Sequence, residues 1–247
     1  MSNFGMVDYM LEISRGNVPG VSCINKFGHN DNVIASFTPV WALGAALVQP
    51  PNTGLFINLR SSVATDIATT GTGARTTYVQ GLNTSFNEVE YTAVSNNGTS
   101  NASVGTLTRI QRAYVETAGS SGFNDGQLEF QNAGTQYSSI EIGYGQTLQA
   151  MYTVPNAKTA YMTNLKITTS GTKAMVVELR GQYGINTATP VWRVQEEIHM
   201  DAGSSVNINY RPYKVFPAMT DIIVFAKVAS LPASEVSASF DLILVDD

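Results

Sequence analysis

The stretch VSASFDLILV, residues 236–245, decides the fold. Apolar side chains stand at every second position, and Ser237, Ser239 and Asp241 alternate with them. Because successive side chains of a β-strand point to opposite faces, this alternation predicts a strand with one buried face. The residues predicted to face the core are Val236, Ala238, Phe240, Leu242 and Leu244.

The same period of two recurs along most of the chain. Segments with this pattern are 88–94, 161–169 and 205–210, and clusters of Ser, Asn, Gly and Thr at 95–101, 118–126 and 169–172 separate the strands. Short strands at such spacing are typical of sandwiches and jelly rolls. The sequence therefore predicts an all-β protein with one or two antiparallel β-sandwich or jelly-roll units. Two segments, 8–14 and 40–48, are suited to short helical pieces.

Three zones follow from the distribution of these patterns. Residues 1–40 are rich in Gly, Asn and Pro and predict an extended N-terminal arm. Residues 41–135 form a first β-sandwich region, and residues 136–247 form a second sandwich or jelly-roll region. Because no long linker separates the two regions, separate domains and a single merged sandwich remain alternatives.

Composition narrows the function classes. Only 13% of the 247 residues are charged, and the net charge is −5. The sequence has no Lys/Arg cluster of the kind that nucleic-acid binding needs, so direct DNA or RNA binding is disfavoured. The longest apolar run is far shorter than the roughly 20 residues of a membrane span, and the first residues lack the basic and apolar regions of a signal peptide. We expect a soluble protein with no membrane partner and no disulfide, since Cys23 is the single cysteine.

The glycine-rich stretch TGTGARTTYVQGL, residues 70–82, raises the question of a phosphate site. A phosphate-binding loop requires a helix after its glycines, with Lys and Ser/Thr at the start of that helix in P-loop proteins. Here Ala74 and Arg75 lead into β-branched and aromatic residues, which predict a strand. The interpretation is a turn formed around Gly71 and Gly73.

Candidate catalytic groups are isolated. The two histidines, His29 and His199, permit a Cys23–His29 dyad or a metal site with Asp31, but no tight spacing supports either, and Cys23 has the apolar surroundings of a buried residue. Nothing selects a glycosidase pair among the acids. We therefore predict no catalytic residues, no metal site and no cofactor. The acids considered are Asp125, Glu129, Glu141, Glu196 and Glu197.

The aromatic residues permit a second hypothesis, glycan binding. Trp41, Trp192 and the 11 tyrosines could form platforms for a glycan, although aromatic side chains in a sandwich usually belong to its core. Apolar residues in the predicted arm cannot be buried by the arm itself, which favours burial against a partner or a second subunit. The predicted partner-binding residues are Ile13, Arg15, Val18, Val21, Ile24, Lys26 and Phe27.

Several segments resemble structural proteins of tailed bacteriophages of the marine-phage type. They are EISRGNVPGVSCINKFGHN, GTGARTTYVQGLN, RIQRAYVETAGSSGFNDGQL, GQTLQAMYTVPNAKTAYM and VSASFDLILVDD, in the same order, while residues 31–70 depart from the pattern. The resemblance implies a non-enzymatic virion protein, synthesised in the bacterial cytoplasm, and carries no catalytic residues. The leading interpretation is a capsid decoration or cement protein that contacts the major capsid protein or other virion proteins through its N-terminal arm, as a homo-oligomer with a trimer as the expected form. The alternative is a tail- or fibre-associated module that binds host surface glycan.

Overall fold

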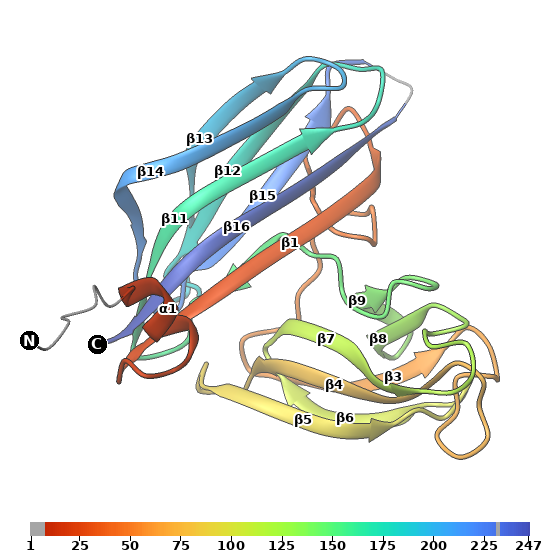
Figure 1. The fold of residues 1–247 in the computed structure, drawn as a ribbon. Coiled ribbons are helices and arrows are strands. Elements are labelled where there is room, and N and C mark those ends of the chain that lie inside the picture. Colours follow the sequence, from red (N-terminus) through yellow and green to blue (C-terminus); the bar gives the residue numbers. More distant parts are fainter. Residues whose placement is uncertain (1–7, 231–232) are drawn as a thin grey trace, which may run out of the picture.

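The computed structural model describes residues 8–230 and 233–247 and shows two β-sandwiches, one inserted into the other (Figure 1). The outer sandwich contains both the first and the last strand of the chain. The inserted sandwich is formed by the middle of the sequence and lies beside one end of the outer one. This arrangement confirms the predicted all-β fold with antiparallel sheets.

The outer sandwich consists of two antiparallel sheets. Its first sheet has the order β1-β16-β11-β14, formed by Val21–Val33, Ser234–Asp246, Lys158–Thr169 and Ser205–Phe216. Its second sheet has the order β10-β15-β12-β13, formed by Met151–Thr153, Asp221–Val228, Met175–Tyr183 and Val191–Met200, and β2, Thr38–Pro39, pairs with β15. The predicted strands at 161–169, 205–210 and 236–245 lie within β11, β14 and β16.

The alternation in β16 produces the core of this sandwich. All five residues that the pattern assigns to the buried face are at most 3% exposed, and they pack with the inner residues of the second sheet, such as Val177, Leu179 and Val224. Burial of large aliphatic or aromatic side chains contributes about 2 kcal/mol each, so this face accounts for much of the stability of the sandwich.

The inserted sandwich also has two antiparallel sheets. Their orders are β6-β3-β8-β9 and β5-β4-β7. The strands are β3 Leu55–Ser61, β4 Ala74–Leu82, β5 Glu88–Ser95, β6 Ala102–Leu107, β7 Arg109–Ala118, β8 Leu128–Asn132 and β9 Thr135–Ile140. A separate core, centred on Phe130, Leu59 and Leu107, lies between the sheets.

The boundaries of the two β regions in the structure differ from the predicted ones. The strands of the inserted sandwich span residues 55–140, whereas the prediction places a first β region at 41–135. The outer sandwich is discontinuous in sequence, because β1 and β2 precede the insertion and β10–β16 follow it.

The prediction of an extended arm over residues 1–40 is corrected for most of its length. Residues 21–33 form β1, which pairs with the C-terminal strand from Val21–Val245 to Val33–Ser234. Residues 1–7 lie outside the described part of the chain. The sequence pattern did not predict strand β1. Its buried positions include Lys26, Gly28 and Asn30, so the strand lacks the apolar alternation of β16.

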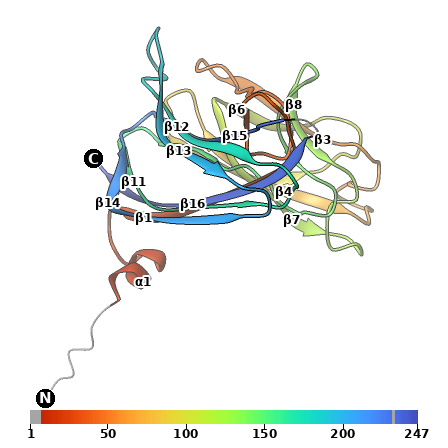
Figure 2. The ribbon, with the colours of Figure 1, turned by 90° about the horizontal axis from the view of Figure 1, so that it is seen from above.

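One predicted helical piece is confirmed and the other is wrong. Helix α1, Tyr9–Ser14, begins after Asp8, whose carboxylate accepts hydrogen bonds from the Met10 and Leu11 amides as an N-cap. It lies on the outer side of the first sheet (Figure 2). Residues 40–48 are turns with a single β-bridge, Trp41–Gln149. Within the described residues, no helix has the length and apolar character to span a membrane.

Candidate functional surfaces

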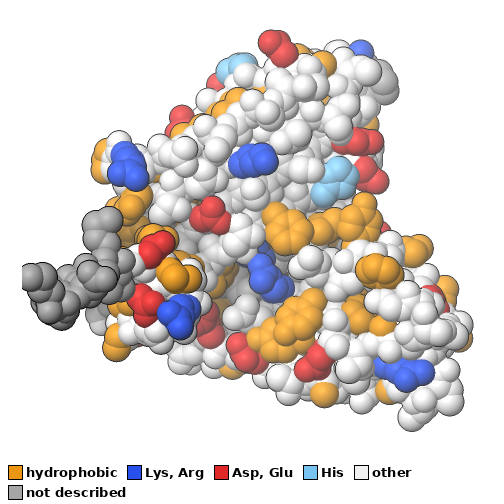
Figure 3. All heavy atoms as spheres, in the orientation of Figure 1, with side chains coloured by type: hydrophobic (Ala, Val, Ile, Leu, Met, Phe, Trp, Pro, Cys, Tyr) orange, Lys and Arg blue, Asp and Glu red, His pale blue; other side chains and the backbone are white. Residues whose placement is uncertain are grey.

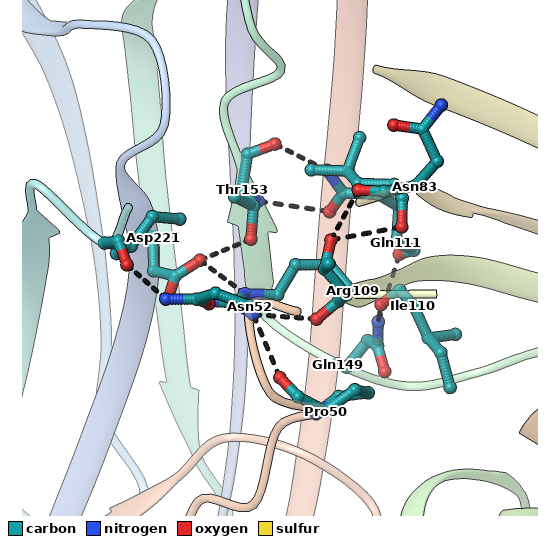
Figure 4. Close-up of polar contacts among 12 residues, drawn as sticks. Pro50, Asn52, Asn83, Arg109, Ile110, Gln111, Gln149, Thr153 and Asp221 are labelled. Atoms are coloured by element: carbon teal, nitrogen blue, oxygen red, sulfur yellow. Dashed lines mark hydrogen bonds and ion pairs between the residues drawn. The ribbon is translucent and has the colours of Figure 1, made fainter. Parts of the chain in front are cut away.

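A buried polar network joins the two sandwiches (Figure 4). Arg109 at the start of β7 donates from Nε and Nη2 to the two carboxylate oxygens of Asp221 on β15, both at 3.0 Å. Its Nη1 donates to the carbonyls of Pro50 and Thr108 at 3.3 and 2.7 Å. Because Asp221 is fully buried, a charge-assisted bidentate pair of this kind fixes the inserted sandwich in one orientation.

Gln111, two residues further along β7, extends the network. Its side chain exchanges two hydrogen bonds with the backbone of Thr153 on β10, and Gln149 Nε2 donates to its carbonyl at 3.0 Å. The ammonium of Lys26 donates to the same carbonyl from β1. Burial, followed by the charge of Arg112, lowers the pKa of Lys26 to about 7. Hydrogen bonds from Arg109, Gln111 and Lys26 thus connect the two sandwiches across the junction.

Gly71 and Gly73 form a turn, as predicted, and β4 begins directly after it at Ala74. Its loop wraps around the buried carboxylate of Asp66, which accepts hydrogen bonds from the hydroxyl of Ser61 at 2.6 Å and the amide of Ala74 at 2.7 Å. The amides of Asp125 and Gly126 donate to it at 2.9 Å. A Cβ at Gly73 would lie 2.1 Å from Asp66 Oδ1, so glycine is required there by this packing.

The candidate catalytic residues are not brought together. Cys23 is exposed, which corrects its assignment as a buried residue. It lies six residues before His29 on the same strand, about 20 Å away at the rise of a strand. His29 Nδ1 lies 2.9 Å from the hydroxyl of Ser237, and His199 lies on β13 in the other sheet, 2.9 Å from Glu197. Among the described residues, no three His, Cys, Asp or Glu side chains could hold a metal ion together.

The acids considered for a glycosidase pair have separate surroundings. Glu129 forms an ion pair with Arg60 at 2.6 Å and Glu196 forms one with Lys214 at 3.1 Å. Hydrogen bonds from Thr72 and Ser121 hold the pKa of Asp125 below its ordinary value. Glu129 and Glu196 are thus each paired with a basic side chain, and Asp125 with two hydroxyl groups.

The predicted partner-binding residues have mostly internal contacts. Ile13 is 3% exposed in α1, Ile24 packs against the outer core, and Lys26 is in the junction. Val18, Val21 and Phe27 are half-buried. Arg15 alone is well exposed, and it pairs with Glu12 at 3.1 Å. The partner contact therefore cannot be made by all seven residues while the outer sandwich is intact.

Exposed apolar residues gather in three other places. The first is α1, where Tyr9, Met10 and Leu11 are 46–60% exposed. The second, which we call the loop tip, consists of Phe123, Ile142 and Tyr144 in the loops at one end of the inserted sandwich. The third set lies on the outermost strands of the two sheets, with Val191, Trp192 and Val194 on β13 of the second sheet and Tyr213 and Val215 on β14 of the first. Trp41, by contrast, is buried.

A groove of about 230 Å³ opens where the two sandwiches meet, next to the loop tip. His29 and Asp31 line it from the outer sandwich, and Glu141, Ile142 and Tyr144 line it from the connecting loop. Figure 3 shows this side of the molecule, with hydrophobic side chains bordering the region between the sandwiches. Periodicity could not locate this groove, because it depends on where the insertion sits.

Comparisons with known proteins give only a loose likeness. No protein-family profile and no curated protein matches the sequence. A structure of infectious bursal disease virus, Gx strain, is 10% identical, with 92% of this chain and 71% of that chain covered at a TM-score of 0.29. A structure of the cowpea mosaic virus top component is 9% identical, with 82% and 85% covered at a TM-score of 0.20. At these TM-scores the likeness carries no conclusion.

Proposed function

We propose that this chain is a non-enzymatic structural protein of a bacteriophage virion, bound to the capsid surface as a decoration or cement protein. The observation that carries the proposal is α1. This short helix lies on the outer side of the first sheet, its Ile13 is buried, and it exposes Tyr9, Met10 and Leu11. Contiguous exposed apolar side chains of this kind mark protein-binding sites.

The rigid junction supports the same proposal. Arg109 and Asp221 hold the two sandwiches as one body, and the glycine-rich loop is occupied by the Asp66 carboxylate. The buried charged groups Arg109, Asp221 and Asp66 thus form contacts that hold the two sandwiches and the glycine-rich loop in place. A protein that reinforces a shell requires a fixed shape and an attachment segment, and in this proposal the junction supplies the first and α1 the second.

Binding to particles tests this function. The full chain and a variant with Tyr9, Met10 and Leu11 changed to Ser are incubated with shells of the phage that encodes the chain, and co-sedimentation is measured. We expect the variant to lose most of its binding while Phe56→Ser, an exposed residue of β3, retains it. Equal binding by the triple variant and the unaltered chain would contradict an attachment through α1.

A second candidate is a tail-associated module that binds host glycan, and the outer face of the first sheet favours it. Four amides and one carboxylate form a row across its four strands: Asn25 Nδ2 donates to Asp241 at 2.6 Å, and Asn164 Nδ2 donates to Asn207 and Asn209 at 2.6 and 3.0 Å. Such a face presents amide groups that can bond to sugar hydroxyls. A glycan array with the unaltered chain and Asn164→Ala tests it, and a bound glycan whose signal falls in the variant would support this candidate.

A further inference from the structure

Two basic side chains line a small pocket where the outer sandwich meets the inserted one. Lys26 comes from β1 of the outer sandwich, and Arg112 comes from β7 of the inserted sandwich. The pocket has a volume of about 70 Å³, which is enough for several waters or one small ion. We propose that this pocket binds a small oxyanion of the sulfate or phosphate class, and that the bound ion bridges the two sandwiches.

The side chain of Lys26 is buried, and its hydrogen-bonding capacity is only partly used. The residue is 4% exposed, and it donates to the carbonyl of Gln111. That carbonyl also accepts a hydrogen bond from Gln149 Nε2 at 3.0 Å, so it does not depend on the lysine. An ammonium group carries three N–H donors. Within the described residues one of them is used, and the others remain for a ligand in the pocket.

Arg112 adds a second positive charge to the same pocket. Its Nη2 donates to the carbonyl of Asn25 at 2.6 Å, which leaves other N–H groups of the guanidinium available. Within the described residues, neither Lys26 nor Arg112 lies within ion-pair distance of a carboxylate. Two cations beside one pocket repel each other, and an anion between them replaces this repulsion with attraction.

The other residues around the pocket suit an oxyanion. None of the described residues that line it is acidic. Gln80 on β4 adds an amide that can donate hydrogen bonds, and Ile24 on β1 and Tyr152 on β10 add walls of low polarity. Hydrogen bonds between charged groups are stronger in such surroundings than in water. The hydroxyl of Tyr152 lies 3.5 Å from Glu88, which is outside the pocket and 4.0 Å from Lys158.

The protonation state of Lys26 makes the binding depend on pH. Burial and then the charge of Arg112 lower the pKa of Lys26 to about 7, so the side chain loses its charge as the pH rises above neutrality. Because an oxyanion favours the charged form, its affinity falls over the same range. Arg112 stays charged throughout. The other titratable groups in the lining are Tyr152, whose pKa is raised by burial, and the exposed Cys23.

Isothermal titration calorimetry of the full chain with sulfate tests the proposal, because sulfate carries the same charge from pH 6 to pH 9. We expect one saturable site with a dissociation constant of about 1 mM or lower at pH 6, and binding at least tenfold weaker at pH 9. Binding at pH 8 should take up protons, which titrations in two buffers of different ionisation enthalpy measure. A chain without saturable sulfate binding at pH 6 would overturn the proposal.

Variants locate the bound ion. Lys26→Met and Arg112→Gln should each weaken sulfate binding at least tenfold at pH 6, and proton uptake should disappear in Lys26→Met. Arg193→Gln removes an exposed arginine of β13 with the same loss of charge, and this control should bind sulfate like the unaltered chain. Cys23→Ser should retain the pH dependence, which separates the thiol from the lysine. Unchanged binding by both pocket variants would place the ion elsewhere and contradict the proposal.

The measurements on the unaltered chain remain decisive if a pocket variant fails to fold. Sulfate binding of equal strength at pH 6 and pH 9, without proton uptake at pH 8, would contradict a site that contains Lys26. Sulfate binding is measured on the isolated chain and particle binding through α1 is measured with shells, so this proposal and the proposed function can fail independently.

Discussion

The guanidinium of Arg109 on β7 and the carboxylate of Asp221 on β15 meet through two hydrogen bonds of 3.0 Å, 112 positions apart in the sequence. The pair lies where the inserted sandwich joins the outer one, and both side chains are buried. The pair belongs to the polar network that connects two cores sharing no strand. We expect it to contribute more to the stability of the chain than an exposed ion pair does.

Loss of one partner of this pair should be costly. Asp221→Asn leaves the Arg109 charge buried without its counter-ion, and we expect the free energy of unfolding to fall by about 3–5 kcal/mol. Denaturant unfolding followed by circular dichroism measures it. Arg60→Met, which removes the partly exposed partner of Glu129, is the control and should cost about 1 kcal/mol or less. Equal losses for the two variants would show that the junction contributes no special stability.

Stability should rise with pH above neutrality because of Lys26. Its pKa falls from 10.5 to about 7 in the folded chain, so between these values the unfolded chain binds the additional proton. Stability from this group therefore increases as the pH rises through that window. Arg112 on β7, Tyr152 on β10 and Cys23 on β1 line the pocket beside Lys26, and burial raises the pKa of Tyr152.

Unfolding free energies at pH 7, 8 and 9 measure this effect. We expect an increase approaching about 1.4 kcal/mol for each pH unit in the unaltered chain and a flatter profile for Lys26→Met. An identical slope in both proteins would contradict the assignment of the effect to Lys26.

The glycine-rich turn should tolerate no side chain. Gly73→Ala places a Cβ 2.1 Å from Asp66 Oδ1 and 2.8 Å from the Asp125 amide, and the loop must shift to accept it. We expect a loss of about 2–4 kcal/mol from disrupted hydrogen bonds to a buried carboxylate. Gly143→Ala is the control, since its backbone φ is +75° and nothing lies within 4 Å, and it should cost only about 1 kcal/mol. A Gly73→Ala protein as stable as the control would contradict this account of the turn.

Truncation should separate α1 from β1. Deletion of residues 1–15 removes the helix and the buried Ile13, and we expect a cooperatively folding protein that loses at most about 3 kcal/mol. Deletion of residues 1–30 also removes most of β1 and should abolish folding of the outer sandwich, because β16 loses one of its two neighbouring strands. Thermal unfolding of both proteins measures the difference. Cooperative unfolding of the longer deletion near the temperature of the intact chain would show that β1 is dispensable.

The sequence predicts strands wherever one face is apolar and the other polar. β16 is the clearest example, since Phe240 and Leu242 face a continuous core. β1 could not be predicted in this way, because its inner side meets loops and the insertion, where Lys26 and Asn30 bond to polar groups. Its pairing with β16 joins residues more than 200 positions apart, and local periodicity contains no information on such pairing.

The candidate surfaces were even less visible in the sequence. The VWRV segment signals an exposed Trp192 only once β13 is known to be an outermost strand. Phe123, Ile142 and Tyr144 lie in loops without periodicity, and hydrogen bonds such as those of Asn124 bring these loops together. The positions of these exposed apolar residues therefore depend on tertiary contacts that the local sequence pattern does not contain.

The central claim, a structural role on the virion, is tested most directly by a cryo-electron-microscopy reconstruction of the particle in which this chain is traced into the density. The account predicts density over the capsid shell, with α1 and its residues Tyr9, Met10 and Leu11 buried against a shell subunit. Density confined to the tail or its appendages would contradict the cement role and favour glycan binding at the amide-bearing face. Absence of the chain from the particle would contradict the virion role itself.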